Sequence, residues 1–299
     1  MSLAAVIDVG TNSAKMAVAD LDNGITIIQE ESEITRLGKG VDAAGMLRVD
    51  AIERTLDAID RFVALAKMAG ARRTKVIGTS ALRDAGNGQT FVDGLFARTG
   101  LTIEIVSGDR EAQLAYGAIR SDASLGISSD EPLAVFDIGG GSTEITLGTG
   151  EQIRAHRSMN VGAVRVTERI LHGDPPLERE LRAGSQLAAD ILSDAPTLSS
   201  RIRGVGIGGT IVNIAAVSVG GAASVHGARL TREQIDGVLG LLAAKTVAER
   251  RAVPGLEPGR ADVIVGGILV VCALMDRLGL SEVGVSTRGL RYGVLAEMA

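Results

Sequence analysis

The chain has 299 residues, enough for one large domain or two medium ones with a substantial core. Its apolar fraction of 45% and charged fraction of 22% are typical of a folded globular protein and exclude an intrinsically disordered one. A net charge of −5 and an aromatic content of 2% disfavour nucleic-acid binding, because a basic surface and rings for base stacking are both scarce.

The sequence opens with strand patterns and then changes to a helical period. Short apolar or alternating runs predict strands, and Asn-Gly at 23–24 predicts a hairpin turn. From Asp50, apolar residues recur at helical spacing until Gly70, with Asp50 and Glu53 as the expected capping pair. Two further strands separated by a helix make this half α/β. The predicted strands are 3–9, 14–20, the part of 21–30 that follows the Asn-Gly turn, 74–80 and 101–107.

The polar segment RSDASLGISSDEP at 120–132 is the expected domain boundary. Beyond it, three strands are predicted in a meander, and residues 202–210 read as a strand, a glycine turn and the start of a helix. Thr231 and Gln234 form an expected capping box. The meander strands are 132–139, 143–148 and 150–158, and the predicted helices are 163–172, 177–193 and 231–248.

No membrane span or signal peptide is expected. The apolar run at 263–275 is too short to cross a bilayer, and the N-terminus has no basic segment before its apolar residues. The single Cys272 cannot form an internal disulfide and is predicted to be a buried thiol. A cytoplasmic protein without a membrane partner is therefore expected.

The opening of the first half recurs in the second half. AAVIDVGTNSAKMAVAD (4–20) aligns without a gap with LAVFDIGGGSTEITLGT (133–149), so that strand, Asp-x-Gly turn and returning strand coincide. Both flanking strands stay in register, which indicates a duplicated domain. The matched pairs are Asp8 with Asp137, Gly10 with Gly139 and Ser13 with Ser142.

Each Asp-x-Gly turn has the chemistry of a phosphate and metal site. A glycine-rich turn exposes backbone N–H groups to phosphate oxygens, and its hydroxyl and amide side chains add donors. An aspartate beside the turn would repel phosphate unless a cation lies between them, so Asp8 and Asp137 predict Mg²⁺. Two such turns facing each other would hold phosphate and metal across a cleft. The alternative is two tight hairpins shaped by Asp and Gly, which the duplication disfavours.

Two other kinds of site match poorly. No G-x-x-x-x-G-K-[ST] phosphate loop occurs, since Lys39 is followed by Gly40. One cysteine and three scattered histidines disfavour a zinc site.

Eight short motifs occur in order between Ile7 and Gly293. Together they resemble the exopolyphosphatase/guanosine pentaphosphate phosphohydrolase family, within the superfamily of actin-like ATPases. The motifs are IDVGTNS, GTSALRDAGN, SGDREAQLAYGA, FDIGGGSTE, NVGAVRVTE, GIGGT, RADVIVGG and GLRYG.

The resemblance implies an α/β fold of two actin-like (ribonuclease H-like) domains with an active-site cleft between them. The first domain is expected at 1–120 plus about 286–299, because the last helix, from about Gly289, returns to it. The second is expected at 121–285. Long family members add a helical region related to His-Asp phosphohydrolases; this chain has no His-Asp pair and is expected to be a short, two-domain form.

The family segment S-G-x-E-E-A reads Ser107-Gly108-Asp109-Arg110-Glu111-Ala112 here. The resemblance assigns the catalytic role to the second acidic position, Glu111. Arg110 replaces the first one and is expected to change the charge beside the water or the substrate. The residues alone leave two roles open for Glu111, a general base or a charge that favours the helix N-terminus.

The resemblance also implies a metal at the second turn, held by Asp137, the Gly139 backbone and Glu144, with Asp8 as a further ligand. Mg²⁺ is expected, with Mn²⁺ as an alternative and a monovalent cation as an addition. Arginine suits phosphate because its fork binds two oxygens, and the motif favours Arg83; Arg165, Arg260 and Arg291 stay open. The expected phosphate-binding residues are Gly10, Thr11, Asn12, Ser13, Lys15, Arg83, Gly139, Gly140, Gly141, Ser142, Thr143, Gly208, Gly209 and Thr210.

The first hypothesis for function is a Mg²⁺-dependent exopolyphosphatase that releases terminal orthophosphate from inorganic polyphosphate. A guanosine pentaphosphate phosphohydrolase is the alternative, although two Tyr and four Phe leave few rings to stack a guanine. A polyphosphate-dependent phosphotransferase and a non-catalytic phosphate-ligand sensor are further alternatives. The family resemblance also allows a homodimer.

Overall fold

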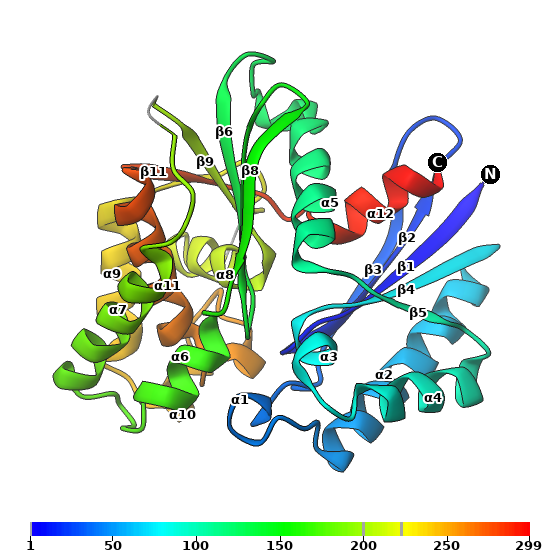
Figure 1. The fold of residues 1–299 in the computed structure, drawn as a ribbon, viewed down its shortest axis with the longest axis horizontal. Helices are drawn as coiled ribbons and strands as arrows, with labels where there is room; N and C mark the ends of the chain where they lie inside the picture. The colour runs from blue at the N-terminus through cyan, green and yellow to red at the C-terminus, as the bar shows by residue number, and fades with distance from the viewer. Residues whose placement is uncertain (1, 199–200, 222–223) are drawn as a thin grey trace. The chain divides into compact units, whose positions relative to one another are not determined.

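The computed structural model describes residues 2–198, 201–221 and 224–299, and the chain divides into two units (Figure 1). Unit 1 is Met1–Leu114 with Leu290–Ala299, and unit 2 is Ala115–Gly289. Each is α/β, as predicted. The domain boundaries expected from the sequence are 1–120 with about 286–299 for the first domain and 121–285 for the second. These boundaries stay a prediction.

Unit 1 is built on a five-stranded sheet in the order β3-β2-β1-β4-β5. β1 pairs antiparallel with β2 and parallel with β4, so the chain makes a hairpin on one side and a crossover on the other. The strands are β1 Leu3–Val9, β2 Ser13–Asp20, β3 Thr26–Ile34, β4 Arg73–Gly78 and β5 Ile103–Ile105.

Helices cover both faces of this sheet. Ile7 and Val9 point into one core with α2, whereas Val6 points into the core on the other face, where α12 packs (Figure 1). Both faces are buried, which explains the continuous apolar run of β1. The helices are α1 Val41–Ala44, α2 Val49–Met68, α3 Ser80–Asp84, α4 Gly88–Thr99 and α12 Leu290–Met298.

The capping pair expected for α2 is wrong. The helix begins one residue earlier, with Arg48 as its N-cap and no side-chain capping bond. Asp50 instead pairs with Arg48 at 2.9 Å on the surface. Asp50 therefore lies inside the first turn of α2, where its charge favours the helix N-terminus, and does not precede the helix as a cap.

Unit 2 contains a six-stranded sheet in the order β10-β11-β9-β6-β7-β8. β6 pairs antiparallel with β7 and parallel with β9, the same arrangement that β1 has with β2 and β4. The strands are β6 Pro132–Ile138, β7 Thr143–Thr149, β8 Gln152–Met159, β9 Arg203–Ile207, β10 Arg229–Thr231 and β11 Glu282–Val285.

One face of this sheet packs on a helical layer around α11, and the other packs on the second half of α5. The capping box at Thr231 is confirmed, but the helix predicted at 231–248 is two helices, because Thr246 caps a new one. The helices are α5 Gly108–Arg120, α6 Ala163–Ile170, α7 Glu178–Leu192, α8 Gly208–Ser218, α9 Arg232–Ala243, α10 Val247–Arg250 and α11 Ile264–Leu278, with short 3-10 turns at Ala123–Leu125 and Pro258–Arg260.

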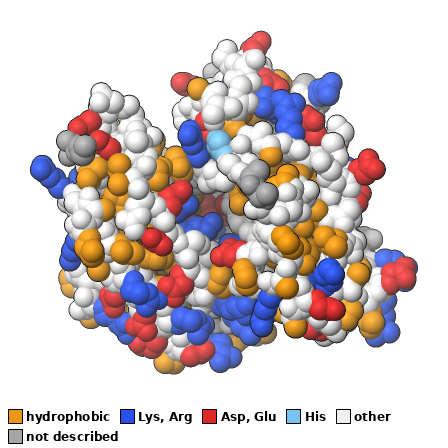
Figure 2. Space-filling view, turned by 180° about the vertical axis from the view of Figure 1, so that it is seen from behind, with side chains coloured by type: hydrophobic (Ala, Val, Ile, Leu, Met, Phe, Trp, Pro, Cys, Tyr) orange, Lys and Arg blue, Asp and Glu red, His pale blue; other side chains and the backbone are white. Residues whose placement is uncertain are grey.

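None of the helices in the described part of the chain has the length and apolarity needed to cross a bilayer. Cys272 lies buried in α11, as predicted, and burial raises the pKa of its thiol to about 12. Such a thiol is protonated and unreactive at neutral pH. On the face shown in Figure 2, basic and acidic side chains are interspersed.

Candidate active site

The first Asp-x-Gly turn joins β1 to β2 and is closed by a hydrogen bond from Gly10 N to Ser13 O of 3.0 Å. Its carbonyls are bonded into unit 1: Thr11 O accepts from Gly38 N, and Asn12 O accepts from two backbone N–H groups at 35–36. The backbone N–H groups of Thr11 and Asn12 bond to no residue that the structure describes. The carbonyl oxygens of this loop are therefore bonded within unit 1, whereas its backbone N–H groups can bind an anion.

The second turn, between β6 and β7, repeats this geometry. Gly139 N donates to Ser142 O at 2.9 Å, and the carbonyls of Gly139 and Gly140 accept from the first N–H groups of α6. The N–H groups of Gly140, Gly141 and Ser142 bond to nothing in the described ranges. Gly162 allows this close approach, since a Cβ there would lie 2.6 Å from Gly140 O. The duplication predicted from the sequence thus extends to the hydrogen bonds.

The two aspartates occupy matching positions at the ends of β1 and β6. Asp8 lies opposite Lys15, and Asp137 lies opposite Glu144, each pair on one face of its hairpin. Oδ1 of Asp8 is buried and has no hydrogen-bond partner in the described chain. Burial raises the pKa of Asp8, and the charges of Lys15 and Arg291 offset this only in part. A buried carboxylate oxygen without a hydrogen-bond partner has the chemistry of a ligand for a cation.

Asp8→Asn is expected to raise the thermal unfolding midpoint at pH 7 in the presence of a chelator. Because the pKa of Asp8 is raised in the fold, its contribution to stability is fully present below its ordinary value of about 3.9 and is lost as the pH rises through the folded value. The amide removes that loss, so the gain should be present at pH 7 and absent near pH 3. Thermal denaturation of both proteins across this range measures it; a lower midpoint for Asp8→Asn at pH 7 would contradict the argument.

In unit 2, Asp137 packs against the glycine turn between β9 and α8, which contains Gly208. Gly208 has φ +81°, and a Cβ on it would lie 2.2 Å from Oδ1 of Asp137. Glu144 is 3% exposed, and its Oε1 accepts from Ser158 Oγ at 2.9 Å. The turn therefore shapes the space around Asp137, a role that glycine alone fills at this backbone conformation.

Three predicted phosphate-binding residues are engaged within unit 2. Thr143 Oγ1 donates to Val161 O at 2.6 Å, and Thr210 Oγ1 donates to Ile138 O at 2.8 Å. Gly209 lies against the guanidinium of Arg260, because a Cβ there would be 2.2 Å from Cζ of Arg260. These side chains support the loops. Any contact of Thr143 or Gly209 with phosphate would come from the backbone.

The described residues contain no group of three or more His, Cys, Asp or Glu side chains that could enclose a metal. What unit 2 offers is the pair Asp137 and Glu144. Mg²⁺ keeps several waters and is commonly bound by one or two carboxylates together with substrate phosphates. The donor set therefore fits Mg²⁺ and does not fit a cation that needs a full protein cage.

Glu111 lies in the first turn of α5, and its side chain does not cap the helix. Ser107 Oγ accepts from Arg110 N and performs that function. The Glu111 side chain is 9% exposed, and its Oε2 accepts from an Nη of Arg83 at 2.8 Å. The same nitrogen donates to Val106 O at 2.8 Å, so Arg83 is fixed from two sides. Glu111 lies in the first turn of α5, so a favourable charge at the helix N-terminus stays open beside the role of general base, and Arg83 contacts the candidate base itself.

The other basic residues have structural partners. Arg110 forms ion pairs with Glu297 of α12 and with Glu104, so its charge lies among surface carboxylates. Arg291 donates to Met16 O at 2.9 Å and pairs with Glu30 at 3.0 Å, which fastens α12 to the sheet of unit 1.

Sequence reasoning missed two supports of the turns. Gly38 packs against the Thr11 side chain, and a Cβ on it would lie 2.4 Å from Thr11 Cγ2. Gly162 stands in the NVGAVRVTE motif, but nothing in its local pattern shows that it contacts the turn at 139–142. The only available signal was a glycine just before a helix.

Comparison with known proteins places these features in a family. The profile described as Ppx/GppA phosphatase family matches residues 16–299. Exopolyphosphatase 2 of Mycobacterium tuberculosis is 35% identical, over 99% of this chain and 98% of that protein.

Solved structures agree. An exopolyphosphatase from Cytophaga hutchinsonii superposes with a TM-score of 0.89 at 25% identity, over 99% of this chain and 97% of that one. A Ppx/GppA family member from Aquifex aeolicus gives 0.81 at 31% identity, with coverage of 99% and 97%. The resemblance and the two-domain fold class inferred from the motifs are confirmed. The chain belongs to the Ppx/GppA phosphatase family.

Proposed function

We propose that the protein is a Mg²⁺-dependent exopolyphosphatase, which hydrolyses the terminal phosphoanhydride bond of inorganic polyphosphate and releases orthophosphate. The observation that carries the proposal is the pair of Asp-x-Gly turns whose carbonyls are bonded inward and whose N–H groups are unbonded among the described residues. Such turns recognise phosphate oxygens and make no demand on the rest of the substrate. Full-length similarity to an exopolyphosphatase supports the same reading.

The proposed reaction needs little covalent chemistry from the protein. The turn N–H groups hold the terminal phosphate, and Lys15 adds a positive charge beside the first turn. Glu111 accepts a proton from the attacking water, and Arg83 keeps its carboxylate in one orientation. The new bond joins the water oxygen to the terminal phosphorus, and the bridging oxygen leaves with the shortened chain.

Asp137 and Glu144 would hold Mg²⁺, and Asp8 is the corresponding carboxylate of unit 1. The ion, when bound, neutralises charge on the phosphate oxygens. The protein's carboxylates would bind the ion next to the phosphate, since without a cation these carboxylates would repel the substrate. Mn²⁺ is the alternative ion, and an added monovalent cation is a further prediction.

The placement of aromatic rings favours polyphosphate over guanosine pentaphosphate. The chain has four Phe and two Tyr. Four of these rings are at most 4% exposed and belong to the cores, and the OH of Tyr116 is bonded to Gly150 O. A guanine base is usually held by stacking, and few rings remain for it. The buried rings are Phe62, Phe91, Phe136 and Tyr116.

The proposal is tested by orthophosphate release from short polyphosphate, long polyphosphate and guanosine pentaphosphate, each with Mg²⁺, Mn²⁺ or a chelator. Metal-dependent release that is fastest from polyphosphate is the expected result. Faster release from guanosine pentaphosphate would replace the proposal with that activity. Phosphate that appears on an added nucleoside diphosphate would indicate a transferase, and binding without turnover would indicate a sensor.

Arg83→Ala is expected to lower kcat by about 10- to 100-fold, because Glu111 loses the contact that orients it and misplacement by about 1 Å can cost that much. Arg83 and Glu111 act together, so the double variant with Glu111→Gln should be little worse than Glu111→Gln alone. Arg98→Ala is the matched control, since Arg98 pairs with surface carboxylates in the same unit. Additive losses in the double variant would show that Arg83 acts separately, for example on substrate.

The homodimer expected from the family remains a prediction. Light scattering of the eluting protein gives its mass in solution, to be compared with 30.8 kDa for one chain.

A further inference from the structure

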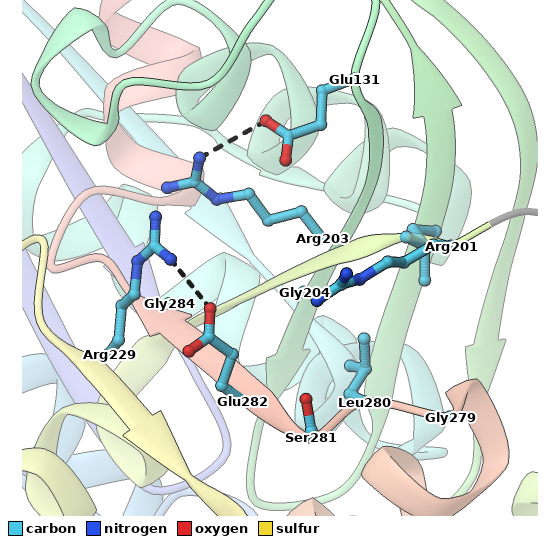
Figure 3. A pocket seen from close by; sticks show the side chains of 11 residues that line it. Glu131, Arg201, Arg203, Gly204, Arg229, Gly279, Leu280, Ser281, Glu282 and Gly284 are labelled. Atoms are coloured by element: carbon cyan, nitrogen blue, oxygen red, sulfur yellow. Dashed lines mark hydrogen bonds and ion pairs between the residues drawn. The ribbon is translucent and has the colours of Figure 1, made fainter.

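Unit 2 contains a cavity of about 270 Å³ at the starts of its strands (Figure 3). Glu131 precedes β6, and Arg203 opens β9, whereas the candidate phosphate turns follow the other ends of these strands. The strands separate the cavity from the turns by roughly 15–20 Å. The lining residues are Glu131, Arg201, Ile202, Arg203, Gly204, Arg229, Gly279, Leu280, Ser281, Glu282 and Gly284.

Three arginines line this cavity against two glutamates, although the chain as a whole carries a net charge of −5. Arg203 is 18% exposed and held in place: it donates to Leu125 O at 2.7 Å and pairs with Glu131 at 3.4 Å. Arg229 pairs with Glu282 at 2.9 Å. The cavity therefore has a local excess of one positive charge, and two of its three arginines are held in place by ion pairs.

Arg201 is the arginine that carries this excess. It forms no hydrogen bond or ion pair with any residue that the structure describes. Arginine presents a planar fork that matches two oxygens of a carboxylate or phosphate. The hydroxyl of Ser281 and the bare backbone at Gly204 and Gly284 line the same space (Figure 3).

We propose that this cavity binds a tetrahedral phosphate group, from orthophosphate or from a small phosphomonoester, at a site separate from the two turns. Pockets for drug-sized ligands run from about 300 to 1,000 Å³. A cavity of about 270 Å³ is at the low end and suits a small anion. Arg201 supplies the charge that the ligand neutralises, and Arg203 and Arg229 complete the positive wall.

The test is a residue-resolved titration of the whole protein with inorganic phosphate, following backbone amide resonances at constant ionic strength. Saturable shifts at the amides of Gly204, Gly279 and Gly284 are expected, independent of shifts at the turns. Chloride at the same ionic strength should not reproduce them. A parallel titration with glycerol phosphate distinguishes orthophosphate from a phosphomonoester. Tighter binding of glycerol phosphate would identify a phosphomonoester as the ligand.

Two variants should move the affinity in opposite directions. Arg201→Ala is expected to weaken binding about tenfold, the effect of losing one charged hydrogen-bonding group. Glu282→Gln removes a repelling charge and releases Arg229, so it should strengthen binding. Arg251→Ala, which removes an exposed arginine of unit 2 outside the cavity, is the matched control. No saturable shift at the three glycines, or equal affinity in Arg201→Ala and Arg251→Ala, would overturn the proposal.

Discussion

Glu111→Gln is expected to lower kcat for orthophosphate release from polyphosphate by about 10²- to 10⁴-fold, the usual contribution of a positioned general base. The amide has nearly the same shape and can still accept from Arg83, but it cannot take a proton from water. Steady-state release with saturating Mg²⁺ measures the loss. If Glu111 acts on the attacking water and does not bind the polyphosphate, the KM should change little.

Glu104→Gln is the control for this variant. Glu104 is a carboxylate of the same unit that is also ion-paired, with Lys75 at 2.8 Å, but 41% of its side chain is exposed. Its variant should keep the wild-type kcat. If Glu111→Gln and Glu104→Gln have the same kcat, and thermal denaturation shows both folded, Glu111 is not the base.

Gly208→Ala is expected to lower both stability and activity. The backbone there has φ +81°, where a side chain costs about 1–2 kcal/mol. The new Cβ would also lie 2.2 Å from Oδ1 of Asp137, so the carboxylate or the turn must move. A displacement of about 1 Å at such a site is expected to reduce kcat about 10²-fold. Thermal denaturation and orthophosphate release at graded Mg²⁺ measure the two effects separately.

Gly220→Ala is the control that separates the backbone strain of a positive φ from the steric clash with Asp137. Gly220 follows the other end of α8 with φ +68°, and a Cβ on it would meet no atom of the described residues within 4 Å. This variant should lose stability through the backbone alone and keep its activity. Equal activity in Gly208→Ala and Gly220→Ala would mean that the geometry around Asp137 does not matter for turnover.

The sequence predicted the repeated hairpins because each carries a strong local signal. An apolar strand, an Asp-x-Gly turn and a returning strand are all encoded within about 17 residues, so the alignment of the two copies matches Asp8 with Asp137. The pairing of Asp8 with Lys15 and of Asp137 with Glu144 across each hairpin is seen in the structure. The glycine turn before α8 was predicted in the same way. Such features depend on neighbours in the chain.

Contacts between distant segments were beyond that reasoning. The ion pair of Arg83 with Glu111 joins residues 28 apart in sequence, and its existence depends on how α3 and α5 pack beside β4. The same holds for Gly208 against Asp137 and for Gly162 against the second turn. A glycine pattern shows that the backbone is free to approach something, but only the fold shows what it approaches.

Local rules also failed where two signals competed. Residues 231–248 have one helical period, but Thr246 with Glu249 forms a capping box that starts a new helix within it. At α2 the capping pair was assigned to Asp50 and Glu53, whereas the helix begins at Val49 without a side-chain cap. In both cases, the apolar period correctly predicted that a helix is present, but the residue at which a helix begins or ends depends on polar contacts that the period does not show.

The most direct test of the central claim is hydrolysis of polyphosphate in ¹⁸O-labelled water, with mass analysis of the orthophosphate released first. If the turns hold the terminal phosphate and Glu111 activates the water that attacks it, each orthophosphate carries one labelled oxygen and the shortened chain carries none. Unlabelled orthophosphate, with the label in the shortened polyphosphate, would mean that water attacks the next phosphorus. That result would contradict the reaction proposed for this site.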